Sequence, residues 1–252
     1  MLVDSMQVYE EIPLITNQAR ARPAELAGIV SVAEEWAVAR HKERAMRVID
    51  GLNEDLPFVL DAGTGMYLNA IVFEIPHSPK VPAKVRAEAE KLAAAAENPR
   101  REARRLELEL TGAPERRSIW EAPLRYEASF LYLRPHRQDL VRNINARCSK
   151  IVREGAEEAK RLLESGTVPN PSAREAIGLK EMLLYASGEL SDDQAEETIA
   201  ARTRRLARRQ IRWFDKLART LPRETRLVVV ESPKDIDALE TKHVMHDIIG
   251  EW

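Results

Sequence analysis

The chain has 252 residues, of which 44% are hydrophobic and 32% are charged, with a formal net charge of −2 and a single cysteine. This length and composition suit a globular protein with one core, or one core plus a small appended domain, and exclude an internal disulfide framework. No apolar run approaches the roughly 18 residues of a bilayer span, and the N-terminus is not a signal peptide, so we expect a cytoplasmic protein without a membrane partner.

The N-terminal part of the chain is predicted to alternate strands with helices. Leu2-Val3 is typical of the end of a strand, and residues 31–50 carry the apolar spacing of a helix. The short apolar run 57–60, followed by Gly63-Thr64-Gly65, favours a buried parallel strand that feeds a tight turn. Residues 66–73 are expected to begin the helix after that turn.

The composition then changes over residues 76–123. Three prolines break the chain, and residues 83–97 and 100–110 follow as charged helices with few large apolar residues. Because such helices bury little, we expect residues 76–123 to form a small inserted helical subdomain. The α/β core is then expected to comprise residues 1–75 and 124–252.

After the insertion, strands and helices alternate again. Gly188 is suited to end one helix, and Ser191 with Gln194 forms a capping box for the next. The alternation predicts an α/β fold with a mostly parallel sheet. The predicted elements are a strand at 129–133, helices at 136–165, 172–187 and 192–220, a strand at 226–230 and a helix at 233–239.

Basic residues gather in two segments although the net charge is near zero. Residues 134–153 contain six arginines and lysines against one acid, and residues 202–219 contain eight against one. Segregated positive charge indicates a surface that meets phosphate. A solvated helix face is the alternative, and part of the second segment is expected to be packed. Four of its residues form a seam at helical spacing: Leu206, Gln210, Trp213 and Leu217.

Four segments together resemble the tRNA dimethylallyltransferase family, and they occur in the family's order. A single match of this kind is weak, whereas several in order over nearly the whole chain are specific. Weaker matches lie at residues 98–107 and 140–147. The four segments are residues 4–9 (DSMQVY), 62–68 (AGTGMYL), 176–181 (AIGLKE) and 203–213 (TRRLARRQIRW).

The resemblance implies a P-loop-kinase-like fold and a specific reaction. Family members move a dimethylallyl group from dimethylallyl diphosphate to N6 of the adenosine 3′-adjacent to the anticodon. That amine is conjugated with the purine ring, so a base must accept its proton, and by its place in the motif Asp4 would be that base. Arg147 matches the arginine that stabilises the leaving diphosphate.

The resemblance also implies partners and a tRNA-binding surface. The expected partners of a monomeric chain are the tRNA anticodon stem-loop and dimethylallyl diphosphate. The target base is flipped into a channel, which Asp4 and the residues after it would line together with Thr64. The residues expected to touch tRNA are Asp4, Ser5, Met6, Gln7, Thr64, Arg86, Arg100, Arg101, Arg104, Gly178, Lys180, Arg205, Arg208 and Arg209.

The chain departs from the family in one major respect. No G-x-x-x-x-G-K-[ST] loop occurs in it, so we expect an N-terminally truncated chain that lacks the first strand, the P-loop and the first helix. The family implies Mg²⁺, whose P-loop ligand is absent here. The alternative to an enzyme is therefore a catalytically inactive tRNA-binding homologue or a gene fragment without the donor-binding loop.

The chain also departs from the family in smaller respects, and two of the expected site residues have alternative roles. The segment 13–18 replaces a family signal, and the stretch between Arg86 and Asn98 is shortened. Without the resemblance, a surface acid or helix cap is the favoured interpretation of Asp4, and Arg147 is equally the partner of Glu154 or Glu158 in an ion pair.

Overall fold

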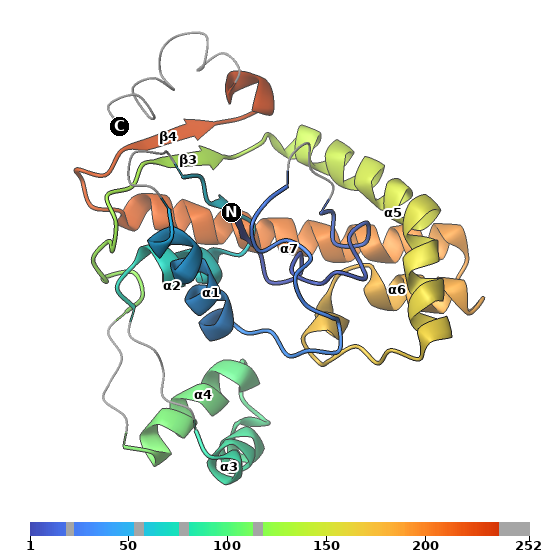
Figure 1. The fold of residues 1–252 in the computed structure, drawn as a ribbon, viewed down its shortest axis with the longest axis horizontal. Helices are drawn as coiled ribbons and strands as arrows, with labels where there is room; N and C mark the ends of the chain where they lie inside the picture. The colour runs from blue at the N-terminus through green and yellow to red at the C-terminus, as the bar shows by residue number, and fades with distance from the viewer. Residues whose placement is uncertain (19–22, 53–57, 76–80, 113–117, 237–252) are drawn as a thin grey trace. The chain divides into compact units, whose positions relative to one another are not determined.

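A computed structural model describes residues 1–18, 23–52, 58–75, 81–112 and 118–236. The chain forms two compact units. Unit 1 comprises Met1–Phe73 and Leu124–Trp252, and unit 2 comprises Glu74–Pro123. Every strand of the described residues belongs to unit 1 (Figure 1). The role in tRNA contact that the sequence predicts for residues 76–123 stays a prediction.

The strands of unit 1 form two small parallel sheets. Strand β1 (Leu2–Val3) pairs with β2 (Asp61–Ala62), and β3 (Phe130–Leu133) pairs with β4 (Leu227–Val230). Parallel pairing with helical connections confirms the expected α/β class in this coarse form. Among the described residues the two sheets share no hydrogen-bonded pair of strands.

The second strand begins later than the sequence predicts. Residues 58–60 are not a strand, and the pairing with β1 starts at Asp61. Val59 is 68% exposed, so the apolar run is not the buried strand that was expected, and residue 57 lies outside the described residues. The turn Gly63-Thr64-Gly65 nevertheless follows β2 and leads into helix α2 (Gly65–Val72).

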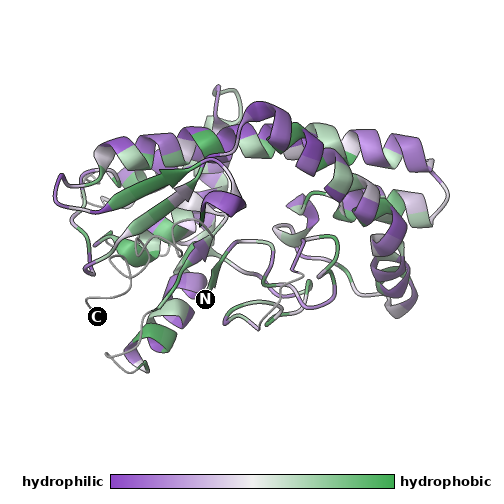
Figure 2. Cartoon of the chain, turned by 90° about the horizontal axis from the view of Figure 1, so that it is seen from above, coloured by the Kyte–Doolittle hydropathy of each residue, from purple (hydrophilic) through white to green (hydrophobic). Residues whose placement is uncertain are grey.

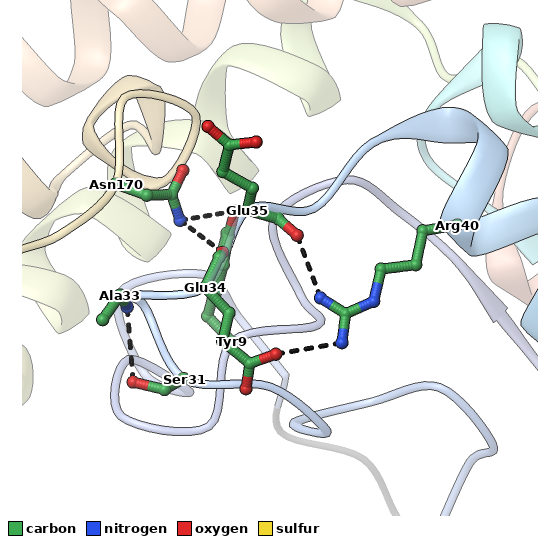
Figure 3. Close-up of polar contacts among 7 residues, drawn as sticks. All are labelled: Tyr9, Ser31, Ala33, Glu34, Glu35, Arg40 and Asn170. Atoms are coloured by element: carbon green, nitrogen blue, oxygen red, sulfur yellow. Dashed lines mark hydrogen bonds and ion pairs between the residues drawn. The ribbon is translucent and has the colours of Figure 1, made fainter. Parts of the chain in front are cut away.

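The first long helix is also shorter than predicted. Helix α1 spans Val38–Asp50, whereas the sequence favours a start at residue 31. Asn170 Nδ2 donates to the Val32 carbonyl at 2.7 Å and to the Glu34 carbonyl at 2.6 Å, the second of which is drawn in Figure 3. These carbonyls are therefore not available to an extended helix. Asn170 Oδ1 in turn accepts from two backbone N–H groups, at 2.8 and 3.1 Å.

Arg40 holds the irregular segment against the start of α1. Its guanidinium donates to the Glu35 carbonyl at 3.0 Å and to the Glu34 carboxylate at 2.9 Å (Figure 3). The same group lies 4.8 Å from the ring centroid of Trp36. Since no side chain caps α1 at Ala37, these contacts define where the helix begins.

Three helices form the body of unit 1 after the insertion. They are α5 (Arg137–Ser165), α6 (Leu179–Ala186) and α7 (Asp192–Thr220). The capping box at α7 is confirmed, because Ser191 Oγ accepts from Gln194 N at 3.3 Å and Gln194 Oε1 accepts from Ser191 N at 3.0 Å. Gly188, with φ of +80°, follows the end of α6 as predicted.

The predicted helix at 172–187 is wrong in its first half. A short 3₁₀ turn at Ala173–Glu175 is followed by α6, and Gly178 between them has φ of +102°. A Cβ at Gly178 would lie 3.1 Å from Ile15, which is fully buried. The chain breaks here because Ile15 occupies the space that a regular helix with side chains would need.

The loop that carries Ile15 is fixed to α5 by a buried carboxylate. Glu158 accepts from the backbone N–H groups of Leu14 and Ile15 at 2.7 and 3.0 Å, and it is 1% exposed. A Cβ at Gly155, on the same helix, would also lie 3.1 Å from Ile15. Burial raises the pKa of Glu158, and the two backbone donors oppose that shift.

In unit 1, apolar strands lie beside helices of mixed polarity. Helix α7 runs along β3 and β4 (Figure 1), and Figure 2 shows these strands as hydrophobic ribbons beside helices of mixed character. The largest fully buried side chains lie mostly in the N-terminal part of the chain and on α6 and α7. They include Leu2, Tyr9, Ile12, Ile15, Ile71, Leu179, Met182 and Ile199.

Unit 2 is a helical hairpin with a core of small side chains. Helix α3 spans Ala83–Ala93, shorter than the predicted 83–97, and α4 spans Pro99–Leu110 after an N-cap at Asn98. Its buried residues are Ala89, Ala93 and Ala103, with Leu106 packed against them. Such a core buries little apolar area, as the composition indicates.

Two further predictions from the sequence concern membrane-spanning helices and the last helix of the chain. In residues 1–18, 23–52, 58–75, 81–112 and 118–236, no helix has the length and apolar character needed to cross a bilayer. Residues 233–236 are helical, and the rest of the helix predicted at 233–239 lies outside the described residues.

Asn170→Ala is expected to destabilise the protein by about 3 kcal/mol, because it removes the side-chain hydrogen bonds to the Glu34 carbonyl and to the N–H groups of Ser172 and Ala173. Urea unfolding followed by circular dichroism measures the change. Asn145→Ala, at an exposed position of α5, is the matched control and should shift stability by less than about 0.5 kcal/mol. Equal unfolding midpoints for the two variants would contradict the role given to Asn170.

His41 provides a pH-dependent contribution to stability. Its side chain is fully buried, its Nδ1 accepts from Trp36 Nε1 at 3.2 Å, and its ring lies 5.0 Å from that of Tyr67. Burial lowers the pKa of His41 from its ordinary value of 6.5 to about 4. The unfolded chain therefore binds a proton between these pH values that the folded chain does not bind.

We expect His41 to remove about 3 kcal/mol of stability as the pH falls from 6.5 to 4. Unfolding free energies of the wild type and of His41→Gln, measured across this range, isolate the contribution as a difference. His136→Gln, at an exposed histidine that pairs with Glu231, is the control. Parallel pH curves for the wild type and His41→Gln would refute the assignment.

Candidate active site

Two loops meet where β1 and β2 end. Asp4 follows β1 and the turn 63–65 follows β2, and because the strands are parallel their carboxyl ends lie at the same edge. The N–H groups of Gly63 and Thr64 both donate to the Val3 carbonyl at 3.2 Å. The turn is therefore attached to the last residue of β1, directly before Asp4.

Asp4 has a carboxylate that is half-buried and surrounded by donors. Its Oδ1 accepts from the N–H groups of Met6 at 2.8 Å and Gln7 at 3.2 Å. Its Oδ2 accepts from Thr64 Oγ1 at 3.4 Å, and Thr64 Oγ1 accepts from Ser5 N at 3.1 Å. The structure thus brings together the five residues that the sequence predicts around this motif.

The Asp4 carboxyl is held more readily in its protonated form than an ordinary aspartate. Burial raises its pKa, while the Met6 and Gln7 N–H groups, the Thr64 hydroxyl and the charge of Arg147 oppose the shift. A carboxylate with a raised pKa is a stronger base than one in water. This is the property that proton abstraction from a weakly acidic group requires.

Helix α7 closes the other side of the turn. Gln210 Nε2 donates to the Gly63 carbonyl at 2.7 Å, and Trp213 packs so closely on Gly65 that a Cβ there would lie 2.1 Å from its ring. A Cβ at Gly63 would lie 2.4 Å from Asp4 Oδ2. Glycine is thus required at both positions by close approach.

Arg147, on α5, supplies positive charge near Asp4. Its Nε is buried and has no hydrogen-bond partner in the described part of the chain. Burial lowers the pKa of Arg147, and the charge of Asp4 opposes that shift, so the two groups interact electrostatically. A small recess beside it is lined by Leu14, Asn17, Arg147, Lys150 and Ile151.

The ion pair offered as an alternative role for Arg147 is not formed. Glu158 is engaged by the backbone of residues 14 and 15. Glu154 lies 3.7 Å from Lys150 Nζ. Since both acids face other partners, the buried Arg147 guanidinium is suited to an anionic ligand.

The remaining predicted residues lie in other parts of the fold. Lys180 lies near the start of α6, and Arg205, Arg208 and Arg209 lie on α7. All four residues are exposed. Gly178 is buried beneath Ile15, which gives it a role in packing. Their contact with tRNA stays a prediction.

The predicted arginines of unit 2 are partly paired. Glu107, which is 6% exposed, pairs with Arg86 Nε at 3.6 Å and also with Arg104. Arg101 is exposed, and the side chain of Arg100 lies outside the description. The structure brings Arg86 and Arg104 to one acid, so much of their charge is compensated locally.

A protein-built magnesium site does not fit the described residues. They contain no group of three or more His, Cys, Asp or Glu side chains that could hold a metal ion. The Asp4 carboxylate is already occupied by backbone and hydroxyl donors. We therefore derive no catalytic step through Mg²⁺ held by these residues.

Sequence reasoning did not include Gln210 or Trp213 among the site residues. The spacing of both on α7 predicts a packed seam, and that packing is confirmed. The signal for their role was available only in part, because periodicity shows which face is buried and not what that face contacts.

Comparison with known proteins adds an independent line of argument. The family model described as IPP transferase matches residues 7–217. The chain is 58% identical over 253 residues to a tRNA dimethylallyltransferase of Rubrobacter xylanophilus, covering 99% of this chain and 87% of the relative. A tRNA dimethylallyltransferase of Phenylobacterium zucineum is 33% identical over 243 residues, covering 84% of this chain and 79% of the relative.

Two solved structures are similar to this fold. The full-length tRNA isopentenylpyrophosphate transferase of Bacillus halodurans aligns with a TM-score of 0.68 and 28% identity, covering 99% of this chain and 88% of that one. The tRNA delta(2)-isopentenylpyrophosphate transferase of Staphylococcus epidermidis aligns with a TM-score of 0.64 and 19% identity, covering 97% and 89%. The second similarity concerns the fold alone.

Gly63→Ala is expected to push the Asp4 carboxylate away from the turn, because the added Cβ would lie 2.4 Å from its Oδ2. Movement toward solvent should lower the pKa of Asp4 toward that of an ordinary aspartate. Carboxyl carbon NMR titration measures this pKa. Gly51→Ala, where the nearest atom lies 3.4 Å from the added Cβ, serves as control, and an unchanged Asp4 titration in Gly63→Ala would argue against the contact.

Proposed function

Because the chain belongs to the IPP transferase family and is a tRNA dimethylallyltransferase, we propose that Asp4 is its general base and that Arg147 binds the leaving diphosphate. The acceptor is N6 of the adenosine 3′-adjacent to the anticodon, and the donor is dimethylallyl diphosphate. The observation that carries the assignment is a carboxylate of raised pKa in the same unit as Arg147, whose buried Nε has no partner among the described residues.

The proton balance of the transfer fits Asp4. As the bond from N6 to the dimethylallyl carbon forms and the bond from that carbon to the diphosphate oxygen breaks, N6 must lose a proton. Asp4 takes this proton, and its partial burial favours the protonated carboxyl that results. The Met6 and Gln7 N–H groups hold Oδ1, so Oδ2 on the side of Thr64 is the atom available to the amine.

The charge balance fits Arg147. Negative charge grows on the diphosphate as its bond to carbon breaks, and a cation in a poorly solvated place stabilises it more than a cation in water would. Arg147 meets this requirement, since burial lowers its pKa and its Nε lacks a protein partner among the described residues.

The tRNA is gripped by exposed basic residues outside the reacting centre. Arg205, Arg208 and Arg209 lie on the exposed face of α7 and meet phosphates of the anticodon stem-loop. Unit 2 provides Arg101 and the pair of arginines at Glu107 as a second contact. Binding of tRNA through these residues weakens steeply as the salt concentration rises. The chain is proposed to act as a monomer.

We infer that the two parallel sheets belong to one P-loop-kinase-like sheet. Among the described residues, β2 pairs only with β1 and β3 pairs only with β4, so each has an edge to which a further parallel strand can add. A strand there that carries a glycine-rich loop would cradle the donor diphosphate beside Asp4. Mg²⁺ would be held by such a loop together with the diphosphate.

The second candidate is a tRNA-binding homologue without transferase activity. It is favoured by one observation, the exposed arginines of α7, which can bind phosphate whether or not transfer follows. A transfer assay with unmodified tRNA, dimethylallyl diphosphate and magnesium, read by nucleoside mass spectrometry, separates the two. Formation of dimethylallyl-adenosine supports the enzyme, and salt-sensitive tRNA binding without product supports the binding protein.

Asp4→Asn is expected to lower kcat by about 100- to 10,000-fold, because it removes the base and keeps the shape of the side chain. The KM for tRNA should change little. In the wild type kcat should rise with pH as the Asp4 carboxyl, whose pKa burial raises, loses its proton, and this limb should be missing in the variant.

Asp193→Asn, at an exposed position in the first turn of α7, is the matched control and should transfer at the wild-type rate. A kcat of Asp4→Asn within a factor of three of the wild type would exclude Asp4 as the base.

A further inference from the structure

The hydrogen bond from Gln210 to Gly63 joins α7 to the turn that bounds the Asp4 carboxylate. At 2.7 Å it links residues 147 positions apart in the sequence. Gln210 is half-buried and lies on the inner face of α7, opposite the exposed Arg208. One turn further, Trp213 packs on Gly65 and donates to Asn69 Oδ1 at 3.3 Å.

The peptide groups of the turn are held from two sides. On one side, the N–H groups of Gly63 and Thr64 donate to the carbonyl of Val3, at the end of β1. On the other side, the Gly63 carbonyl accepts from Gln210. The β1–β2 sheet has only two residue pairs, Leu2↔Asp61 and Val3↔Ala62, so the strands alone constrain the turn weakly.

The 63–65 turn fixes the position of the Asp4 carboxylate. Thr64 Oγ1 donates to Asp4 Oδ2, and the Cα of Gly63 approaches the same oxygen so closely that no Cβ fits between them. A small rotation of the Gly63 peptide would therefore move both the hydroxyl donor and the surface against which Oδ2 rests. The orientation of Asp4 depends on that peptide.

We propose that Gln210 is a positioning residue for the transfer reaction, which holds the 63–65 turn, and through it Asp4, in the orientation that accepts the N6 proton. The proposal rests on the proposed function of Asp4. Gln210 acts without touching the substrate, so its loss affects the chemical step and not the binding of tRNA or donor. Trp213 supports the same turn by packing.

The test uses two substitutions of the same residue in the full chain. Gln210→Met keeps the length of the side chain and removes the donor, and Gln210→Glu keeps its shape and removes the N–H. Gln138→Met makes the first change at an exposed position of α5 and is the matched control. If Gln210→Met fails to fold, Gln210→Glu carries the test.

The first measurement is amide hydrogen exchange by NMR. The N–H groups of Ser5, Met6 and Gln7 report directly on the site, because they donate to Thr64 Oγ1 and Asp4 Oδ1. In both Gln210 variants these three amides should exchange at least about 10-fold faster, while the amides of Ile151 and Val152 in α5 keep their wild-type rates. The Gln138→Met control should leave all of them unchanged.

The second measurement is steady-state transfer kinetics. In both Gln210 variants kcat should fall about 10- to 100-fold, with KM for tRNA and for dimethylallyl diphosphate within about threefold of the wild type. Unchanged exchange of the three reporter amides overturns the proposal, and so does an equal acceleration of the α5 amides, which would show a general loss of stability.

The two measurements also separate this proposal from the one on which it rests. If the wild-type chain forms no product, the proposed function fails, and the exchange of the three amides still decides whether Gln210 holds Asp4. If transfer occurs and Asp4→Asn abolishes it, but both Gln210 variants retain full kcat, the role of Asp4 stands and the role of Gln210 is rejected.

Discussion

Parallel pairing of β1 with β2 is the constraint on which the geometry of the candidate site depends. The pairing brings the ends of two strands, some 60 residues apart in sequence, to one edge, so that Asp4 faces the Gly63-Thr64-Gly65 turn. The Val3 carbonyl accepts from the first two N–H groups of that turn. A sheet of two residue pairs is too small to fix this geometry alone, and α7 supplies the remaining constraint.

The charged groups discussed for unit 1 differ in whether their buried atoms have partners within the fold. Glu158 accepts from two backbone N–H groups, and Glu181 pairs with Arg202 at 2.7 Å while it accepts from Gly178 N at 3.1 Å. These acids are satisfied within the fold and hold loops to helices. Arg147 differs, because its buried Nε has no partner among the described residues, as expected for a group that awaits an anion.

Helix α7 combines two tasks through its amphipathic character. Its outer face presents Arg205, Arg208 and Arg209 to solvent, while its inner face presents Gln210 and Trp213 to the turn beside Asp4. Part of the seam of mixed apolar and polar residues that the sequence predicts is thus the contact of the helix with the turn 63–65. The proposed contact with tRNA on one face and the proposed positioning of Asp4 on the other would then be served by a single rigid element.

The sequence alone determined the features that depend on neighbouring residues. Helices α5 and α7, the capping box at Ser191 and the glycine turn were predicted from local patterns. The assignment of Asp4, Thr64 and Arg147 to the site comes from the family resemblance and stays a prediction. The start of α1, the break at Gly178 and the contact of Gln210 with Gly63 were decided only by the tertiary structure. Each depends on a partner more than 100 residues away, Asn170, Ile15 or Gly63. Local periodicity carries no information about such partners, because a long-range hydrogen bond or packing contact overrides local preference only once the chain has folded.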